Sequence, residues 1–405
     1  MGQQRCPAWA IRLQAEREAR GWNKSEMARR LRREAGHEHG PVESLVRQIR
    51  DWEKGRHFPR DWAYAYAGAF GIPQDELFRA YRPNQCEVLK AAADLITIGP
   101  ASPPPHRGHV APEVVMYFLE QLPGHYRADM WLGPRHLIPT VTTQAQLIKE
   151  LASAADAPVR RGLLGAGVAY ATLLGWLYQD AGDIARSGAW RTLGLDMAHR
   201  SQDPQLIGYA LTNKAMHALD LGDGSTVVDY AEAALADEHL LCPKVRVLAL
   251  VHCAHGHSML PSRDKGLVDR LLDRAAGLVD QVDDEHPWGN ACRRTPGYID
   301  VQRATAYVRL GAHHKAVEMW DRILGTAPET ARRDNGVFLA RQACALAMVP
   351  EPERVVQIVL ATAVIARDTG SARLRNDLRA IPRRATTWRD TPAGRDLTEI
   401  IANIA

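Results

Sequence analysis

Cysteine is scarce in this chain of 405 residues, and no two cysteines form a C-x-x-C pair. A disulfide framework or a cysteine-rich zinc site needs clustered cysteines at fixed spacings, so the sequence disfavours both. Scattered single thiols are typical of a reducing compartment, and we expect a cytoplasmic protein. The six cysteines are Cys6, Cys86, Cys242, Cys253, Cys292 and Cys344.

Long apolar runs are also missing. No run approaches the roughly 18 residues that a membrane-spanning helix needs. The first residues, MGQQRCPAWAIRLQAERE, lack the apolar core of a signal peptide. We therefore expect no membrane partner.

The familiar catalytic motifs are absent as well. The chain has no H-E-x-x-H, no phosphate-binding P-loop, no G-x-G-x-x-G and no G-x-S-x-G. One local cluster, His252-Cys253-Ala-His255-Gly-His257, offers pairs of ligands at helical spacing. Its two pairs, His252/His255 and Cys253/His257, point in different directions, and no second pair follows at a fixed spacing. We predict a protein that is not an enzyme and has no cofactor and no metal.

What the sequence does have is an ordinary globular composition, with 46% hydrophobic and 24% charged residues. The length suggests two or three domains. Residues 1–82 contain 16 Lys/Arg and 11 Asp/Glu, a net charge of +5, whereas the whole chain has only +4. A basic excess confined to one small region favours a module that binds a polyanion.

Glycines divide the first 80 residues into short helices. Gly21, Gly55 and Gly71 each follow an amphipathic segment, where glycine adopts the left-handed conformation that ends a helix. Asn23 is placed to cap the second helix, with Glu26 three positions later. We expect five helices here, the last formed by residues 73–78.

The third of these helices, residues 41–55, has two distinct faces. Leu45, Ile49 and Trp52 form an apolar stripe that packs on the domain. The other face presents guanidinium and amide groups, which pair with guanine and adenine edges in the DNA major groove. Phosphate contacts are expected from Lys24, at a helix N-terminus, and from the residues that follow the third helix. The predicted DNA-binding residues are Lys24, Ser44, Arg47, Gln48, Arg50, Lys54, Arg56 and Arg60.

Several separate stretches in this region resemble the Cro/repressor-type (XRE) helix-turn-helix family. The stretches are Arg17-Glu-Ala-Arg-Gly21, Asn23-Lys-Ser-Glu-Met-Ala28, Leu31, Trp52-Glu-Lys-Gly55, Pro59 and Gly71-Ile-Pro-Gln-Asp-Glu-Leu77. The resemblance implies a five-helix, lambda-repressor-like domain that binds double-stranded DNA, in which Trp52 and Glu53 are structural. Lys24 stands where the family often has glutamine, and the turn at residues 32–40 is longer than usual.

Residues 83–112 are expected to form a proline-rich linker that contains a short helix at 87–98. Beyond it the sequence is helical nearly throughout. Glycines 182, 222, 266 and 311, which are 40, 44 and 45 residues apart, separate paired amphipathic segments, and a further turn lies at 350–352. Helical hairpins that recur at such a period are typical of an α-solenoid. We predict an all-α chain with domains at 1–82 and 113–405.

The region from Glu113 onward resembles the tetratricopeptide-like C-terminal domains of actinobacterial regulators. The similarity includes Gly175-Trp-Leu-Tyr-Gln-Asp-Ala-Gly-Asp183 and Trp388-Arg-Asp-Thr-Pro392. It implies a sensor that binds a peptide, a small molecule or a protein partner in a concave groove. An asparagine there is able to hydrogen-bond a peptide backbone in both directions. The candidate groove residues are Tyr170, Tyr178, Tyr209, Asn213 and Lys214.

Two functions fit these patterns. The first is a homodimeric, sequence-specific transcriptional regulator whose DNA affinity depends on what the repeats bind. The second is a helical-repeat scaffold with a degenerate helix-turn-helix that makes protein contacts. The basic excess of residues 1–82 and the exposed Arg47, Gln48 and Arg50 favour the first.

Overall fold

A computed structural model describes residues 7–35, 43–59, 62–72, 77–78, 110–327, 332–349 and 351–404. Throughout these ranges the regular secondary structure is helical, and no strand is found in them. The prediction of an all-α chain is confirmed. The chain divides into two compact units, residues 1–88 (the N-terminal unit) and 89–405 (the C-terminal unit).

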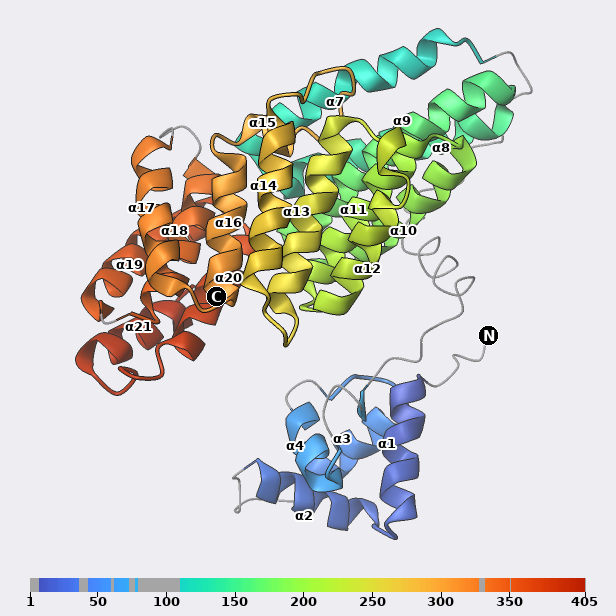
Figure 1. Ribbon diagram of the computed structural model, residues 1–405. Helices are drawn as coiled ribbons and strands as arrows, with labels where there is room; N and C mark the ends of the chain where they lie inside the picture. Colours follow the sequence, from blue (N-terminus) through green and yellow to red (C-terminus); the bar gives the residue numbers. More distant parts are fainter. Residues whose placement is uncertain are drawn as a thin grey trace. The chain divides into compact units, whose positions relative to one another are not determined.

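The N-terminal unit packs four described helices around a small apolar core (Figure 1). Asn23 caps the second helix by accepting a hydrogen bond from the Glu26 amide at 2.8 Å, as predicted. The predicted stops at Gly21, Gly55 and Gly71 all have positive φ. The second helix extends to Glu34, so the first residues of the turn expected at 32–40 are helical. The rest of that turn, residues 36–40, and most of the expected fifth helix, residues 73–76, lie outside the described residues. The helices are α1 (Ala8–Ala19), α2 (Lys24–Glu34), α3 (Glu43–Glu53) and α4 (Ala63–Phe70).

A buried ion pair ties three of these helices together. Arg17 of α1 donates to both carboxylate oxygens of Glu53, at 2.5 and 3.1 Å, and also to the Trp22 carbonyl at 2.8 Å. Lys24, the first residue of α2, lies 3.0 Å from Glu53 Oε2. Because the carboxylate of Glu53 is almost inaccessible, its charge depends on these two cations. Glu53 therefore fixes the end of α3 against α1 and α2.

The C-terminal unit is an array of helices in which consecutive helices pack side by side (Figure 1). Its apolar core forms two large clusters, one within residues 118–306 and one within residues 301–404, and Leu310 packs against both. A third, small cluster joins Ala215, Ala218 and Val227. This is a helical-repeat type of packing. The helices are α7 (Glu113–Leu132), α8 (Pro134–Ala154), α9 (Ala157–Ala181), α10 (Ile184–Ser201), α11 (Pro204–Asp220), α12 (Gly224–Leu235), α13 (Pro243–Met259), α14 (Lys265–Val279), α15 (Ala291–Arg294), α16 (Tyr298–Arg309), α17 (His313–Thr326), α18 (Arg332–Leu346), α19 (Pro352–Thr369), α20 (Ala372–Arg384) and α21 (Pro392–Ala402).

The predicted turns coincide with breaks between helices, and aspartates cap the helices that follow. Asp183, Asp223 and Asp264 each accept a hydrogen bond from a backbone amide in the first turn of α10, α12 and α14. An aspartate cap satisfies an otherwise unpaired amide and places negative charge at the positive end of the helix dipole. Gly266 is the second residue of α14, which begins at Lys265, and so follows the break between α13 and α14.

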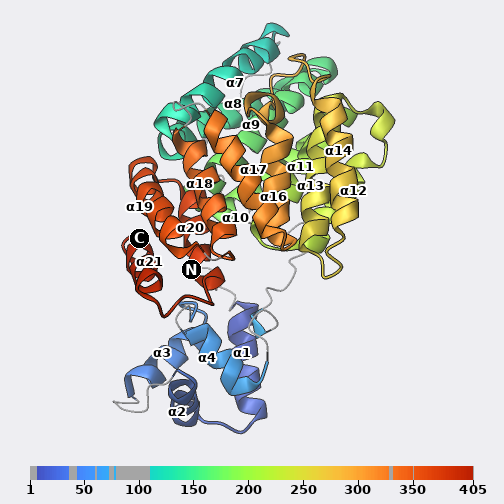
Figure 2. The ribbon, with the colours of Figure 1, turned by 60° about the vertical axis from the view of Figure 1, so that its left-hand side comes forward.

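The array bends until its far end meets its beginning. α20 packs against α9, and in Figure 2 α18–α20 lie next to α7–α9. Arg333 of α18 donates to both oxygens of Asp129 in α7, at 2.7 and 3.2 Å, and lies 3.2 Å from Asp180 of α9. Ser371 donates to the other oxygen of Asp180 at 2.6 Å. We call these four residues the closing clasp.

The closing clasp is buried, so losing its cation should lower the free energy of unfolding strongly. The side chains of Arg333, Asp129 and Asp180 are only 11%, 8% and 1% exposed. We expect Arg333→Ala to lower the free energy of unfolding of the C-terminal unit by about 3–5 kcal/mol, because two buried carboxylates lose their cation. Denaturant unfolding of the full chain, followed by tryptophan fluorescence, measures this loss.

Arg332 is the matched control. It is the neighbouring residue and pairs with Asp368 at the surface, where both side chains are about half exposed. Arg332→Ala should cost less than about 1 kcal/mol. Equal losses in the two variants would show that the clasp does not hold the array closed.

Candidate functional site

The first candidate site is the outer face of α3. Leu45, Ile49 and Trp52 are buried, so the predicted apolar stripe is confirmed. The other predicted side, which bears two arginines, is exposed to solvent. Arg47 and Arg50 form no ion pair with any other described residue, so both charges are available to a partner. The exposed residues are Ser44, Arg47, Gln48, Arg50 and Lys54.

The remaining predicted DNA-binding residues are differently placed. Lys24 is engaged by Glu53, as described above, and is only partly exposed. Arg56 is exposed and pairs with Asp51 at 2.9 Å. Arg60 lies outside the described residues. The structure therefore groups Ser44, Arg47, Gln48, Arg50 and Lys54 on or just after one helix, with Arg56 two residues beyond Lys54.

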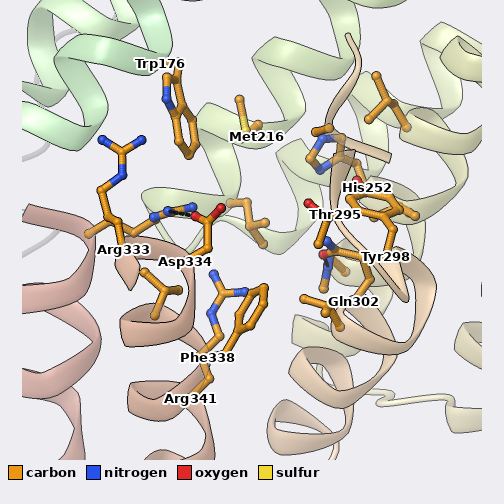
Figure 3. A pocket seen from close by; sticks show the side chains of 18 of the residues that line it. Trp176, Met216, His252, Thr295, Tyr298, Gln302, Arg333, Asp334, Phe338 and Arg341 are labelled. Atoms are coloured by element: carbon orange, nitrogen blue, oxygen red, sulfur yellow. Dashed lines mark hydrogen bonds and ion pairs between the residues drawn. The ribbon is translucent and has the colours of Figure 1, made fainter. Parts of the chain in front are cut away.

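The second candidate site is a cavity of about 920 Å³ within the C-terminal unit. Its wall is built from side chains of α7, α9, α10, α11, α13, α16, α17, α18 and α20, together with the segment at residues 289–297, so both ends of the array contribute. Figure 3 shows α18 side chains on one side of the cavity and side chains from α13 and α16 facing them. The cavity thus exists because the array closes on itself.

The lining combines apolar surfaces with hydrogen-bonding groups (Figure 3). Trp176 and Met216 lie at one end, and Phe338 and Tyr298 face each other across the space. The size and the mixture of aromatic surface with a few polar groups are typical of a ligand site. The polar groups that converge on the same space include His252, Thr295, Gln302 and Arg341.

Charged side chains of both signs line the cavity. Arg373 pairs with Asp334 at 3.3 Å and its guanidinium lies over the ring of Trp176. Arg341 lies 3.4 Å from Asp377. Asp220 is exposed to the cavity, and desolvation by the surrounding wall raises its pKa to about 6. A ligand here meets paired cations and a weakly acidic carboxyl.

Arg309 is a partly buried cation whose contacts fix the protonation state of His255. It donates to His255 Nδ1 at 2.8 Å, and His255 Nε2 lies 2.8 Å from Gln302 Oε1. Since the arginine donates to Nδ1, the imidazole is neutral and carries its proton on Nε2. Burial lowers the pKa of Arg309 to about 10 and that of His255 well below its usual range. At neutral pH this pair therefore contributes one positive charge to the cavity wall.

The predicted groove residues divide into two groups. Tyr209 and Asn213 line the cavity, where Tyr209 stacks on Trp288 and Asn213 donates to the Tyr209 carbonyl at 2.9 Å. The others pack elsewhere in the unit. Tyr170 donates to the Phe118 carbonyl at 3.0 Å, Tyr178 lies under Arg186, and Lys214 donates to Thr192 at 3.1 Å.

The cluster around His252 is split by α13, as its spacing predicted. His252 and His255 line the cavity, whereas Cys253 and His257 lie beside Glu232 of α12. Burial raises the pKa of the Cys253 thiol to about 11 and lowers that of His252 to about 4. Glu232 lies on another helix, so helical spacing within residues 252–257 could not reveal that it joins this group.

No described helix combines the length and the apolar character that crossing a membrane requires. No model of a known protein family matches the chain, and a search of curated protein sequences finds no match. Function is therefore inferred from the geometry of these two sites.

Buried neutral histidines make the stability of the C-terminal unit pH-dependent. The pKa of His252 is about 4 in the folded chain and about 6.5 when unfolded, so the unfolded state binds more protons between these values. The contribution of neutral His252 to the free energy of unfolding is present above pH about 6.5 and is lost as the pH falls towards 4. The free energy of unfolding should fall less on acidification in His252→Gln than in the wild type. We expect the difference between pH about 7 and pH about 5 to be on the order of 1–2 kcal/mol.

Thermal unfolding at both pH values measures this effect. Asp220→Asn is the informative comparison, because the pKa of Asp220 is raised in the folded chain whereas that of His252 is lowered. The contribution of Asp220 to the free energy of unfolding is present at acid pH and is lost as the pH rises through about 6. The two variants should therefore change the pH dependence in opposite directions. An unchanged acid loss in His252→Gln would contradict the assignment.

Proposed function

We propose that this chain is a sequence-specific DNA-binding transcriptional regulator, and that its helical-repeat unit binds an effector in the cavity. The observation that carries the proposal is the outer face of α3. It presents Arg47, Gln48 and Arg50 to solvent on a helix whose other face is buried. Such a helix docks on its own domain and leaves bidentate donors free for base edges.

The packing around α3 supports a reading role. The buried pair of Glu53 with Arg17 fixes the end of the helix, and Trp52 packs against Tyr66 of α4 with ring centroids 5.9 Å apart. A helix that reads DNA must hold its side chains in one orientation, because base-edge hydrogen bonds tolerate little displacement. The resemblance of residues 11–78 to the XRE family supports the same proposal.

The cavity supports the effector part of the proposal. Its wall combines Trp176, Phe338 and Tyr298 with Arg341 and Gln302, which suits a peptide or small molecule with both apolar and polar groups. An effector that contacts α18 and α13 together binds the closed array more tightly than an opened one. Differential affinity of this kind is what couples a ligand to a second site. The active form is proposed to be a homodimer, whose two-fold symmetry would set the half-site spacing.

DNA binding is tested with the full chain and fluorescent genomic fragments, by anisotropy at two salt concentrations. Binding should weaken steeply with salt, because phosphate neutralisation releases counterions. Arg47→Ala and Arg50→Ala should each weaken specific binding by about 1–3 kcal/mol and relax the sequence preference.

Arg200→Ala is the control, since this exposed arginine of the C-terminal unit pairs only within its own helix with Asp196. It should leave affinity and preference unchanged. If no fragment binds above background at low salt, the regulator proposal fails and the scaffold alternative takes its place. If binding survives both α3 variants with the same sequence preference, the reading face is wrongly assigned.

Effector binding is tested by narrowing the cavity. Low-molecular-weight fractions from cells that naturally produce the chain should include one that raises the unfolding temperature of the wild type. Met216→Trp fills the end of the cavity beside Trp176 and should abolish this increase. Met348→Trp, at an exposed site away from the cavity, should keep it. The effector proposal fails if no fraction stabilises the wild type or if both variants respond alike.

A further inference from the structure

A sulfur, a nitrogen and an oxygen ligand meet on the face of α13 that does not line the cavity. Cys253 and His257 are one helical turn apart on α13, and Glu232 reaches them from α12. One ligand atom from each of the three residues lies within 4.8 Å of the other two. The thiol is buried, the imidazole is partly exposed and the carboxylate is exposed, so the group is open to solvent on one side.

Two glycines bring the helices close enough for this meeting. A Cβ at Gly256 would lie 2.7 Å from Val228 Cγ2 and 3.0 Å from the Gly224 carbonyl oxygen. A Cβ at Gly224 would lie 2.8 Å from Met259 Cβ. Glu232 follows Val228 by one turn of α12, and Gly256 lies between Cys253 and His257. The close approach at Gly256 therefore places the Glu232 carboxylate against the two α13 side chains.

Nothing else in the described part of the chain accounts for the group. None of these three side chains makes a hydrogen bond or an ion pair with a described residue. The nearby arginine, Arg274, instead donates to both carboxylate oxygens of Glu238, at 3.2 and 2.9 Å. An exposed carboxylate alone is commonplace, but a buried thiol and an imidazole at its side form a mixed set of ligands.

We propose that Glu232, Cys253 and His257 bind a divalent transition-metal ion of the zinc type. Thiolate, imidazole and carboxylate are together the ligands that Zn²⁺ prefers, and softer or harder ions are served less well by this mixture. On binding, the Cys253 thiol transfers its proton to water and its sulfur bonds to the ion. Three protein ligands leave one position of a tetrahedral ion open to water or to a partner's ligand.

The proposed ion would join α12 to α13, and α13 also carries His252 and His255 of the cavity wall. The metal site is independent of the proposed function, since it involves no residue of the α3 face and no residue that lines the cavity. Metal binding at this site would overturn the expectation that the chain holds no metal.

The experiment is a titration of the metal-free full chain with Co²⁺, a spectroscopic substitute for Zn²⁺, followed by competition with Zn²⁺. The wild type should bind one Co²⁺ per chain, with a sulfur-to-cobalt charge-transfer band that Zn²⁺ abolishes. Cys253→Ser should remove the band. Loss of an outer-shell partner alone costs about 10–100-fold in metal affinity, so Glu232→Gln and His257→Gln should each cost at least about 100-fold.

Glu232→Gln keeps the proposal testable if the buried Cys253 variant unfolds, because Glu232 is exposed and its substitution spares the core. Two controls come from the segment between α12 and α13: Cys242→Ser changes another thiol, and His239→Gln changes an exposed imidazole. Both should bind Co²⁺ as the wild type does. The proposal is overturned if the wild type shows no charge-transfer band, or if Glu232→Gln binds Co²⁺ with undiminished affinity.

Discussion

The C-terminal unit depends on one buried guanidinium. Arg333 lies between Asp129 and Asp180, which are more than 150 residues away along the chain, and Ser371 completes the contact. A solenoid without such a contact would be an open arc with a shallow concave side. Here the clasp brings α18 and α20 against α7 and α9, so an open groove becomes the cavity, with walls on several sides. The chemistry of its wall follows from this closure.

A buried acidic group has the same role in the N-terminal unit. Glu53 holds Arg17 and Lys24 together and so fixes three helices with one carboxylate. In both units the apolar residues supply most of the burial, whereas charge pairs with little access to water select one arrangement of the helices. Burying both charges costs desolvation free energy, and leaving one of them without its partner costs more. Such a pair therefore favours the single helix arrangement in which both charges meet.

The sequence predicts local features well and distant ones poorly. The buried and exposed sides of α3 follow from helical periodicity, and the breaks near Gly182, Gly222 and Gly311 follow from residues adjacent in the chain. The cavity wall does not, since Phe338 and Arg341 meet Trp176 and Tyr298 only through closure of the array. Tyr170 and Tyr178, which were candidate groove residues, are instead part of the packing of the core.

The clasp also determines at what stage of folding the cavity forms. Contacts between consecutive helices are local and form early, whereas a contact such as that between Asp129 and Arg333 must wait for a long loop to close. During synthesis, the helices up to α16 are able to stack hairpin by hairpin as they leave the ribosome. The cavity is complete only after α18 and α20 have emerged. A nascent or truncated chain that lacks them would be folded along most of its length and yet unable to enclose a ligand.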